Sequence, residues 1–183
     1  MRPNPHLQEE NVAEYLLYIY QIEAMVRTLD LDLQRIEQAL LVPAFSDAAQ
    51  LQNQLGWYQN LLNEMQQRGL QKEGHIEQVE EILMELIYLH NTLLTILNDE
   101  KYKALCEQAN EALQAFKVKA NMVQKHDVDV LLHAMFMKLQ LKMKKQDISP
   151  ETEAAFDLFR IQLAYLSKSY KRMKAGELNF IQN

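Results

Sequence analysis

The sequence predicts an all-α protein: a single-domain antiparallel helical bundle of six or seven helices, built around a helix at residues 12–26. Drawn as a helix, residues 12–26 (VAEYLLYIYQIEAMV) point apolar side chains in nearly every direction, so other helices have to cover them. Only four glycines and four prolines occur in 183 residues, and a sheet protein needs more turn-forming residues than that. Apolar residues make up 48% of the chain, and its length is sufficient to bury a sizeable core.

Capping residues and chain breakers set the boundaries of the expected helices. A Ser, Asp or Asn side chain accepts a hydrogen bond from a free N–H at a helix start, and a glycine or proline ends a helix. The expected helices cover about residues 7–28, 30–41, 47–69, 76–97, 99–122, 128–146 and 150–176. Their expected N-caps are Asp30, Ser46 or Asp47, Asn98 or Asp99, Asp127 and Ser149. Residues 1–6 and 177–183 are expected to be loose tails within the one domain, 1–183.

The strongest of these boundaries is Ser149-Pro150-Glu151, where three physical effects agree. A capping hydroxyl, a proline in the first turn and an acid beside the positive end of the helix all favour a helix start. The break at residues 125–127 depends on Asp127 as a cap, and one long bent helix is the alternative. Short connections between amphipathic helices make sequential neighbours antiparallel.

Residues 10–23, ENVAEYLLYIYQIE, resemble an uncharacterised bacterial family known as an all-helical domain of unknown function. The resemblance covers most of the chain and includes its ending KRMKAG, residues 171–176. It implies a shared helical fold and a bacterial, intracellular setting. It implies no activity, because no catalytic or binding residues are established for the family.

Composition excludes several classes of protein. The longest uncharged stretch, residues 86–98, is shorter than the roughly 18 apolar residues that a membrane span needs. Cys106 is the only cysteine, so it cannot form an internal disulfide, and no apolar run behind Arg2 resembles a signal peptide. We therefore expect a cytoplasmic protein with no membrane partner.

Histidines supply the main candidates for a metal site. His126, Asp129 and His133 share one face of the sixth expected helix, and His90 falls on the apolar face of the fourth. If both faces met at one cavity, imidazoles and carboxylates would converge as a divalent transition metal requires. The simpler alternative places the three-residue stripe in water and makes His90 a hydrogen-bonded core histidine. The Glu-x-x-His pairs of di-iron bundles and the His-Glu-x-x-His zinc pattern are absent from the sequence.

Two acids lie in the otherwise apolar first helix. A buried carboxylate with a raised pKa is a general-acid candidate, which makes Glu14 and Glu23 worth weighing. The interpretation we favour is structural: Glu14 joins a solvated stripe, and Glu23 pairs with Arg27 one turn later.

Basic residues gather in two groups, at residues 138–145 and 168–174. Each group lies at the C-terminal end of an expected helix, where cations offset the helix dipole. The net charge is −6, so we do not expect nucleic-acid binding. The four glycines form no phosphate-binding loop, and Cys106 has no evident histidine partner in the sequence.

With no complete catalytic constellation, the sequence favours a non-enzymatic interaction or assembly module without a cofactor. The alternative is a helical bundle with an internal metal or small-ligand site, formed by His90 with His126, Asp129 or His133. A protein partner or a second copy of the chain is left open. Trp57 would mark such an interface if it were exposed beside other apolar side chains.

Overall fold

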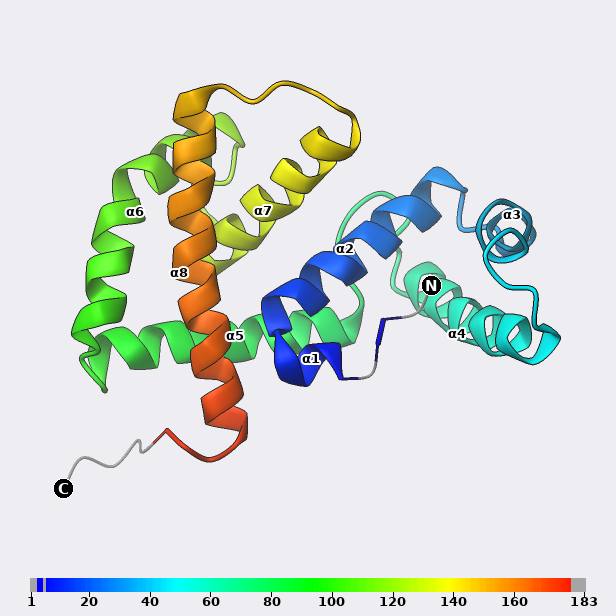
Figure 1. The fold of residues 1–183 in the computed structure, drawn as a ribbon, viewed down its shortest axis with the longest axis horizontal. Coiled ribbons are helices and arrows are strands. Elements are labelled where there is room, and N and C mark those ends of the chain that lie inside the picture. The colour runs from blue at the N-terminus through cyan, green and yellow to red at the C-terminus, as the bar shows by residue number, and fades with distance from the viewer. Residues whose placement is uncertain (1–2, 5, 179–183) are drawn as a thin grey trace. The chain divides into compact units, whose positions relative to one another are not determined.

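The computed structural model describes residues 3–4 and 6–178, which form helices and connections without a strand (Figure 1). The all-α prediction is confirmed. The helices of the described residues are α1 Leu7–Glu10, α2 Val12–Thr28, α3 Leu33–Ile36, the π-helical turn η1 Glu37–Leu41, α4 Ala48–Gln67, α5 Glu77–Thr95, α6 Glu100–Lys119, α7 Asp127–Met143 and α8 Pro150–Lys174. The expected tails, residues 1–6 and 177–183, fall partly on residues 1–2, 5 and 179–183, which lie outside the described residues.

Each of the seven expected segments contains a helix, but the first two are subdivided. Asn11 is extended, with φ −153° and ψ 92°, so the expected helix 7–28 is broken into α1 and α2. The side-chain oxygen of Asn11 accepts a hydrogen bond from the backbone N–H of Glu14, which caps α2. The second segment continues from α3 directly into the wider turn of η1.

Side-chain caps set most of the remaining boundaries. Asp47, Asp99 and Ser149 each accept a hydrogen bond from the backbone N–H three residues ahead, as predicted. Two predicted caps are wrong. Asp32 caps α3 in place of Asp30, whose backbone has the left-handed φ of 56°. His126 caps α7 in place of Asp127, because its ring nitrogen reaches the backbone N–H of Val128.

A break between α6 and α7 rules out the alternative of one long bent helix. Asn121 adopts the left-handed φ of 55°, and the chain turns before α7 begins. The helix is interrupted where a short polar side chain tolerates this backbone conformation.

The central apolar segment is covered, as predicted. Tyr15, Leu16, Ile19, Tyr20 and Ile22 are all buried in α2. A helix with apolar side chains on most of its surface is stable in water only when neighbours cover it. No helix in the described part of the chain combines the length and apolarity that a bilayer crossing requires.

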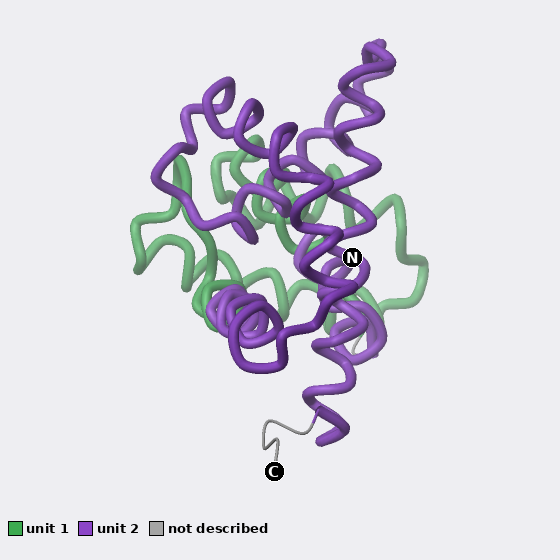
Figure 2. Tube along the Cα trace, turned by 90° about the vertical axis from the view of Figure 1, so that its left-hand side faces the viewer, with its two compact units in different colours: residues 1–5, 18–81 green, residues 6–17, 82–183 purple. Residues whose placement is uncertain are grey.

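The backbone divides into two compact units (Figure 2). Within the described residues, unit 1 consists chiefly of residues 18–81, and unit 2 of residues 6–17 and 82–178. Helices α2 and α5 each contribute residues to both units. The prediction of a single domain stays a prediction.

Unit 1 packs α3, η1 and α4 around a small apolar core. Its deeply buried large side chains include Ile36, Leu41, Tyr58, Leu62 and Met65. Trp57 meets Tyr58 edge to face and is half-buried, while Tyr58 is fully buried. The two adjacent aromatic residues therefore divide between the core and its margin.

Unit 2 is organised around the antiparallel pair α6 and α8, which lie side by side (Figure 1). The pairing is visible in two contacts. Tyr165 donates to Asp99 at the start of α6, and Phe116 near its end packs edge to face on Phe156 and Phe159. The start of α6 therefore lies beside the second half of α8, and the end of α6 lies beside the first half of α8, so the two helices run antiparallel. Helix α7 packs on both.

Candidate functional site

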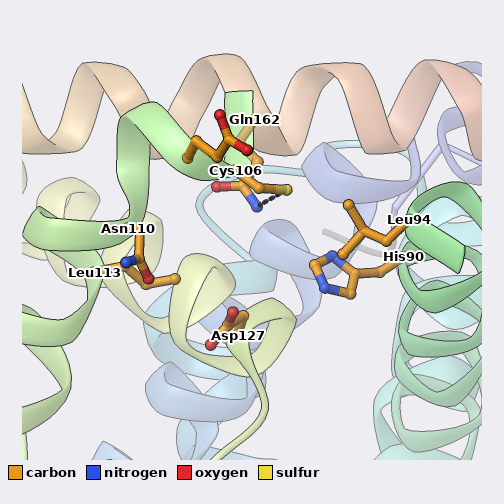
Figure 3. A pocket seen from close by; sticks show the side chains of 8 residues that line it. His90, Leu94, Cys106, Asn110, Leu113, Asp127 and Gln162 are labelled. Carbon is orange, nitrogen blue, oxygen red and sulfur yellow. Dashed lines mark hydrogen bonds between the residues drawn. The ribbon is translucent and has the colours of Figure 1, made fainter. Parts of the chain in front are cut away.

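A solvent-open cavity of about 310 Å³ lies in unit 2, where four helices meet (Figure 3). Its lining residues come from α5 (His90, Leu94), α6 (Cys106, Glu107, Asn110, Leu113), the start of α7 (Asp127) and α8 (Gln162). The cavity therefore combines polar side chains from helices far apart in the sequence.

His90 is held neutral on one wall of the cavity. Its side chain is almost fully buried, and Nδ1 lies 2.8 Å from the hydroxyl oxygen of Tyr102. The ring of His126 lies edge-on to the His90 ring, with centroids 5.1 Å apart. Burial lowers the pKa of His90 to about 4, and the neighbouring His126 adds to this shift. The imidazole is therefore uncharged at neutral pH.

Cys106, which lines the same cavity as His90, is a protonated thiol at neutral pH. Burial raises the pKa of Cys106 to about 11, and the negative charges of Asp127 and Glu107 contribute to the rise. The side-chain nitrogen of Gln162 donates to Sγ of Cys106 at 3.2 Å. Since the thiolate is the reactive form of cysteine, this sulfur is a poor nucleophile at neutral pH.

Gln162 carries the most unusual atom of the cavity. The residue is 1% exposed, and its Oε1 has no hydrogen-bond partner within the described structure. The amide nitrogen is already engaged, by Cys106 and by the phenol oxygen of Tyr102. A buried polar atom without a partner is uncommon in folded proteins. Gln162 lines the cavity, but Oε1 itself is buried, so a ligand in the cavity can donate to this atom only after a rotation of the Gln162 side chain.

Asp127 contributes a carboxylate to the cavity wall, and a buried lysine forms an ion pair with this carboxylate. Nζ of Lys117 lies 2.5 Å from Oδ1 of Asp127, and Lys117 is itself buried. Asp127 is the first residue of α7, where the partial positive charge of the helix end also favours a carboxylate.

The predicted metal-site residues are only partly brought together. His90 and His126 are in ring contact, whereas His133 lies further along α7 with its ring 6.3 Å from that of Phe116. Asp129 is half-buried in the first turn of α7. Among the described residues, no three His, Cys, Asp or Glu side chains converge as a metal would require. The metal site stays a prediction.

Of the eight lining residues, only His90 is a site residue predicted from the sequence. The polar residues that sequence reasoning missed are Cys106, Glu107, Asn110, Asp127 and Gln162. For Gln162 a signal was present, because this polar residue interrupts an apolar face that continues through Phe159 and Leu163. For Cys106 and Asp127, only the packing of α6 against α7 and α8 shows that they line a common space.

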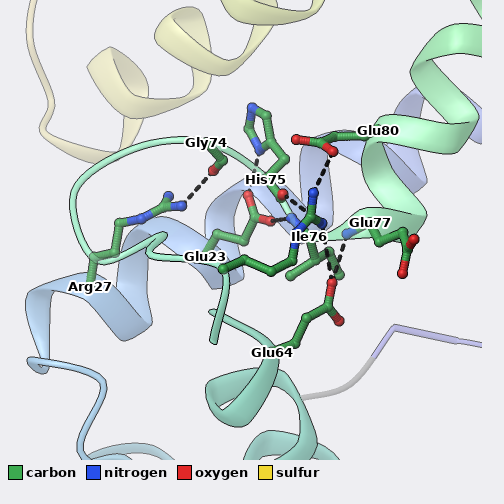
Figure 4. Close-up of polar contacts among 9 residues, drawn as sticks. Glu23, Arg27, Glu64, Gly74, His75, Ile76, Glu77 and Glu80 are labelled. Carbon is green, nitrogen blue, oxygen red and sulfur yellow. Dashed lines mark hydrogen bonds and ion pairs between the residues drawn. The ribbon is translucent and has the colours of Figure 1, made fainter. Parts of the chain in front are cut away.

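The ion pair predicted between Glu23 and Arg27 is wrong, whereas Glu14 is exposed, as the structural interpretation expected. Glu23 does not bond to Arg27: it is fully buried, with one oxygen 2.6 Å from Nδ1 of His75 and the other accepting the N–H of Ile76 at 2.9 Å (Figure 4). Arg27 instead donates to the carbonyl oxygens of Leu70 and Gly74. Both side chains turn toward the connection between α4 and α5, because its backbone polar groups need partners.

Further polar contacts secure the same connection within unit 1. Arg68 forms an ion pair with Glu80 at 2.6 Å, and a carboxylate oxygen of Glu64 accepts the backbone N–H of Glu77 at 2.7 Å. The ring of His75 stacks on Tyr20 with centroids 4.0 Å apart. These contacts hold the connection between α4 and α5 in place, which is a structural role.

Comparison with known families identifies the family of the chain. Residues 2–177 match the family described as a domain of unknown function, DUF4924, and the chain belongs to that family. The resemblance inferred from residues 10–23 is thereby confirmed. No curated protein and no solved structure matches the chain.

Proposed function

We propose that this member of the DUF4924 family is a non-enzymatic binding domain whose cavity in unit 2 holds a small polar ligand. The observation that carries the proposal is Gln162, which lines a cavity of about 310 Å³ and whose buried Oε1 has no hydrogen-bond partner in the described structure. Leaving a buried acceptor unsatisfied costs about 1–3 kcal/mol, and a ligand N–H or O–H would offset that cost.

The protonation states favour binding over catalysis. With a pKa of about 4, His90 is a weak base, and with a pKa of about 11, Cys106 is almost entirely a thiol at pH 7. General acid–base catalysis works best when the pKa of the group is near the working pH, and nucleophilic catalysis by cysteine needs the thiolate. The pKa of neither residue suits catalysis at neutral pH.

The cavity also limits the size of the ligand. Its volume is at the lower end of the range of about 300–1,000 Å³ typical of small-molecule sites. One water occupies about 30 Å³ in the liquid, so the space suits a compound of roughly ten non-hydrogen atoms.

A ligand screen tests the proposal directly. We expect that screening small polar compounds by saturation-transfer NMR gives compounds that bind the wild-type chain and lose binding in Gln162→Leu. Gln108→Leu is the matched control, because Gln108 is exposed on α6 and does not line this cavity. The proposal fails if no compound binds, or if every compound that binds is unaffected by Gln162→Leu.

The metal site remains a second candidate, favoured by the contact between His90 and His126. It would use these two histidines, with Asp129 or His133 supplying a further ligand after rearrangement. Elemental analysis of protein purified without a histidine tag tests it. A transition metal bound below about a tenth of an equivalent would contradict this candidate, since a resident metal site is expected to retain its ion.

An assembly function is the remaining candidate, supported by an exposed apolar pair on α5. Met84 and Tyr88 are 65% and 61% exposed and lie one turn apart on the same helix face. A second copy of the chain is the partner we would test, by light scattering of wild type and Tyr88→Glu. A wild-type mass that stays monomeric at high concentration would exclude self-association.

The bacterial, cytoplasmic setting is part of the proposal and is supported by the family resemblance and the single cysteine.

A further inference from the structure

We infer that the ligand of the unit 2 cavity is a small organic cation with N–H donors, of the alkylammonium or alkylguanidinium class. The inference rests on the proposed function, because it specifies the occupant of the same cavity. It combines two independent observations: the charge of the cavity wall and the kind of hydrogen-bonding atom that is left without a partner.

The charged side chains of the wall are acidic. Its eight lining residues include Glu107 and Asp127 and contain no lysine or arginine. Lys117 pairs with Asp127 and offsets part of this charge, while Glu107 is exposed at the cavity's edge. The negative field reaches the interior, because both carboxylates raise the pKa of the Cys106 thiol. A cation is favoured in this field and an anion is repelled.

The hydrogen-bonding groups point to a donor ligand. The buried Oε1 of Gln162 is an acceptor without a partner, whereas its amide nitrogen already donates to Cys106 and Tyr102. Glu107 adds a carboxylate, which accepts hydrogen bonds, to the same wall. A ligand N–H can therefore satisfy Gln162 while its charge lies near Glu107.

His90 does not counter this preference. The groups close to it are Tyr102, which is hydrogen-bonded to its ring, His126 and Asp127. Its pKa of about 4 keeps it neutral at pH 7, so it adds no positive charge that would attract an anion.

Cys106 supplies a built-in reporter for the test, since it lines the cavity and is the only cysteine in the chain. We would measure the rate at which methyl methanethiosulfonate modifies Cys106 in the full chain, by mass spectrometry at constant ionic strength and pH 7. Four probes of similar size separate the contributions: butylammonium, butyramide, butyrate and tetramethylammonium. Millimolar concentrations are appropriate, because ligands this small bind weakly.

We expect butylammonium to slow the modification most, butyramide to slow it at least threefold less, and butyrate and tetramethylammonium to have no effect. Tetramethylammonium carries the charge without an N–H, so its failure would show that Gln162 needs a donor. Equal or better protection by butyrate or butyramide overturns the inference but leaves the cavity as a binding site. No protection by butylammonium also overturns it, and the compound screen then decides separately whether the cavity binds anything.

Two matched variants sharpen the result. Glu107→Gln should weaken butylammonium protection about two- to fivefold, the range expected for one partly solvated charge interaction, and leave butyramide unchanged. Glu111→Gln makes the same charge change one turn further along α6, outside this cavity, and should have no effect. Equal effects of the two variants would assign the preference to general surface charge and overturn the inference.

Discussion

Single polar side chains inside the apolar core distinguish this protein from a generic helical bundle. Gln162, His90 and Glu23 are each buried, and they differ in which of their polar atoms have a hydrogen-bond partner. Glu23 has partners for both of its carboxylate oxygens, His90 has Tyr102, and Gln162 has one atom without any partner in the described structure. The last arrangement leaves the hydrogen-bonding capacity of a buried acceptor unused.

Glu23 is expected to stabilise the fold. Glu23→Gln keeps the size of the side chain but removes the charge that strengthens its bonds to His75 and Ile76. We expect the free energy of unfolding to fall by about 2 kcal/mol, measured by urea denaturation. Glu14→Gln, in the exposed part of the same helix, is the control and should change it by less than about 0.5 kcal/mol. Equal effects would show that the buried contacts of Glu23 contribute nothing specific.

His90 is expected to make the fold sensitive to acid. Its pKa is about 4 in the folded chain and about 6.5 when unfolded, so the unfolded state binds the proton more readily between these values. Stability is therefore complete above about pH 6.5 and declines as the pH falls toward 4, by up to about 3 kcal/mol. Urea denaturation across this range should show the decline in wild type and a flatter profile in His90→Gln. The same slope in both proteins would assign the acid sensitivity to other groups.

At the scale of elements, helix boundaries follow the residue that can reach a free N–H. Asp47, Asp99 and Ser149 do so where the sequence indicated. Asp30 does not, because its backbone is left-handed and Asp32 is the residue that meets the N–H groups of α3. A candidate cap can be read from residue type, but the choice between neighbouring candidates depends on backbone conformation.

The cap of α8 provides a test at this scale. Ser149→Ala removes the hydroxyl that accepts the N–H of Thr152 at 3.3 Å and should destabilise the protein by about 1 kcal/mol, seen as a lower Tm. Ser46→Ala is the matched control, since Asp47 caps α4 and Ser46 is exposed. A Tm loss as large for Ser46→Ala would contradict the assignment of caps.

At the scale of the whole molecule, two helices belong to both compact units. Residues 12–17 of α2 group with unit 2 and its later residues with unit 1, and α5 is divided in the same way. Melting one unit alone would break both of these helices internally, at the cost of their hydrogen bonds and packing.

We therefore expect one cooperative unfolding transition. Calorimetry and circular dichroism should give coincident midpoints, with the calorimetric and van't Hoff enthalpies equal. Ile19→Pro, inside α2, should lower the midpoint of this single transition and should not produce a second one. Two separate transitions would overturn the single-domain prediction and define the units as domains.

The sequence by itself determined the all-α class, the seven helical segments and the burial of most apolar residues of the segment 15–22, because these depend on local propensity, capping and apolar periodicity. It also placed His90 in an apolar face. The tertiary structure alone decided that Glu23 bonds to His75 and not to Arg27, and that His90, Cys106, Asp127 and Gln162 line one cavity. The reason is physical: these contacts join residues as many as 72 positions apart, and helix periodicity specifies which face a side chain occupies but not which helix packs against it.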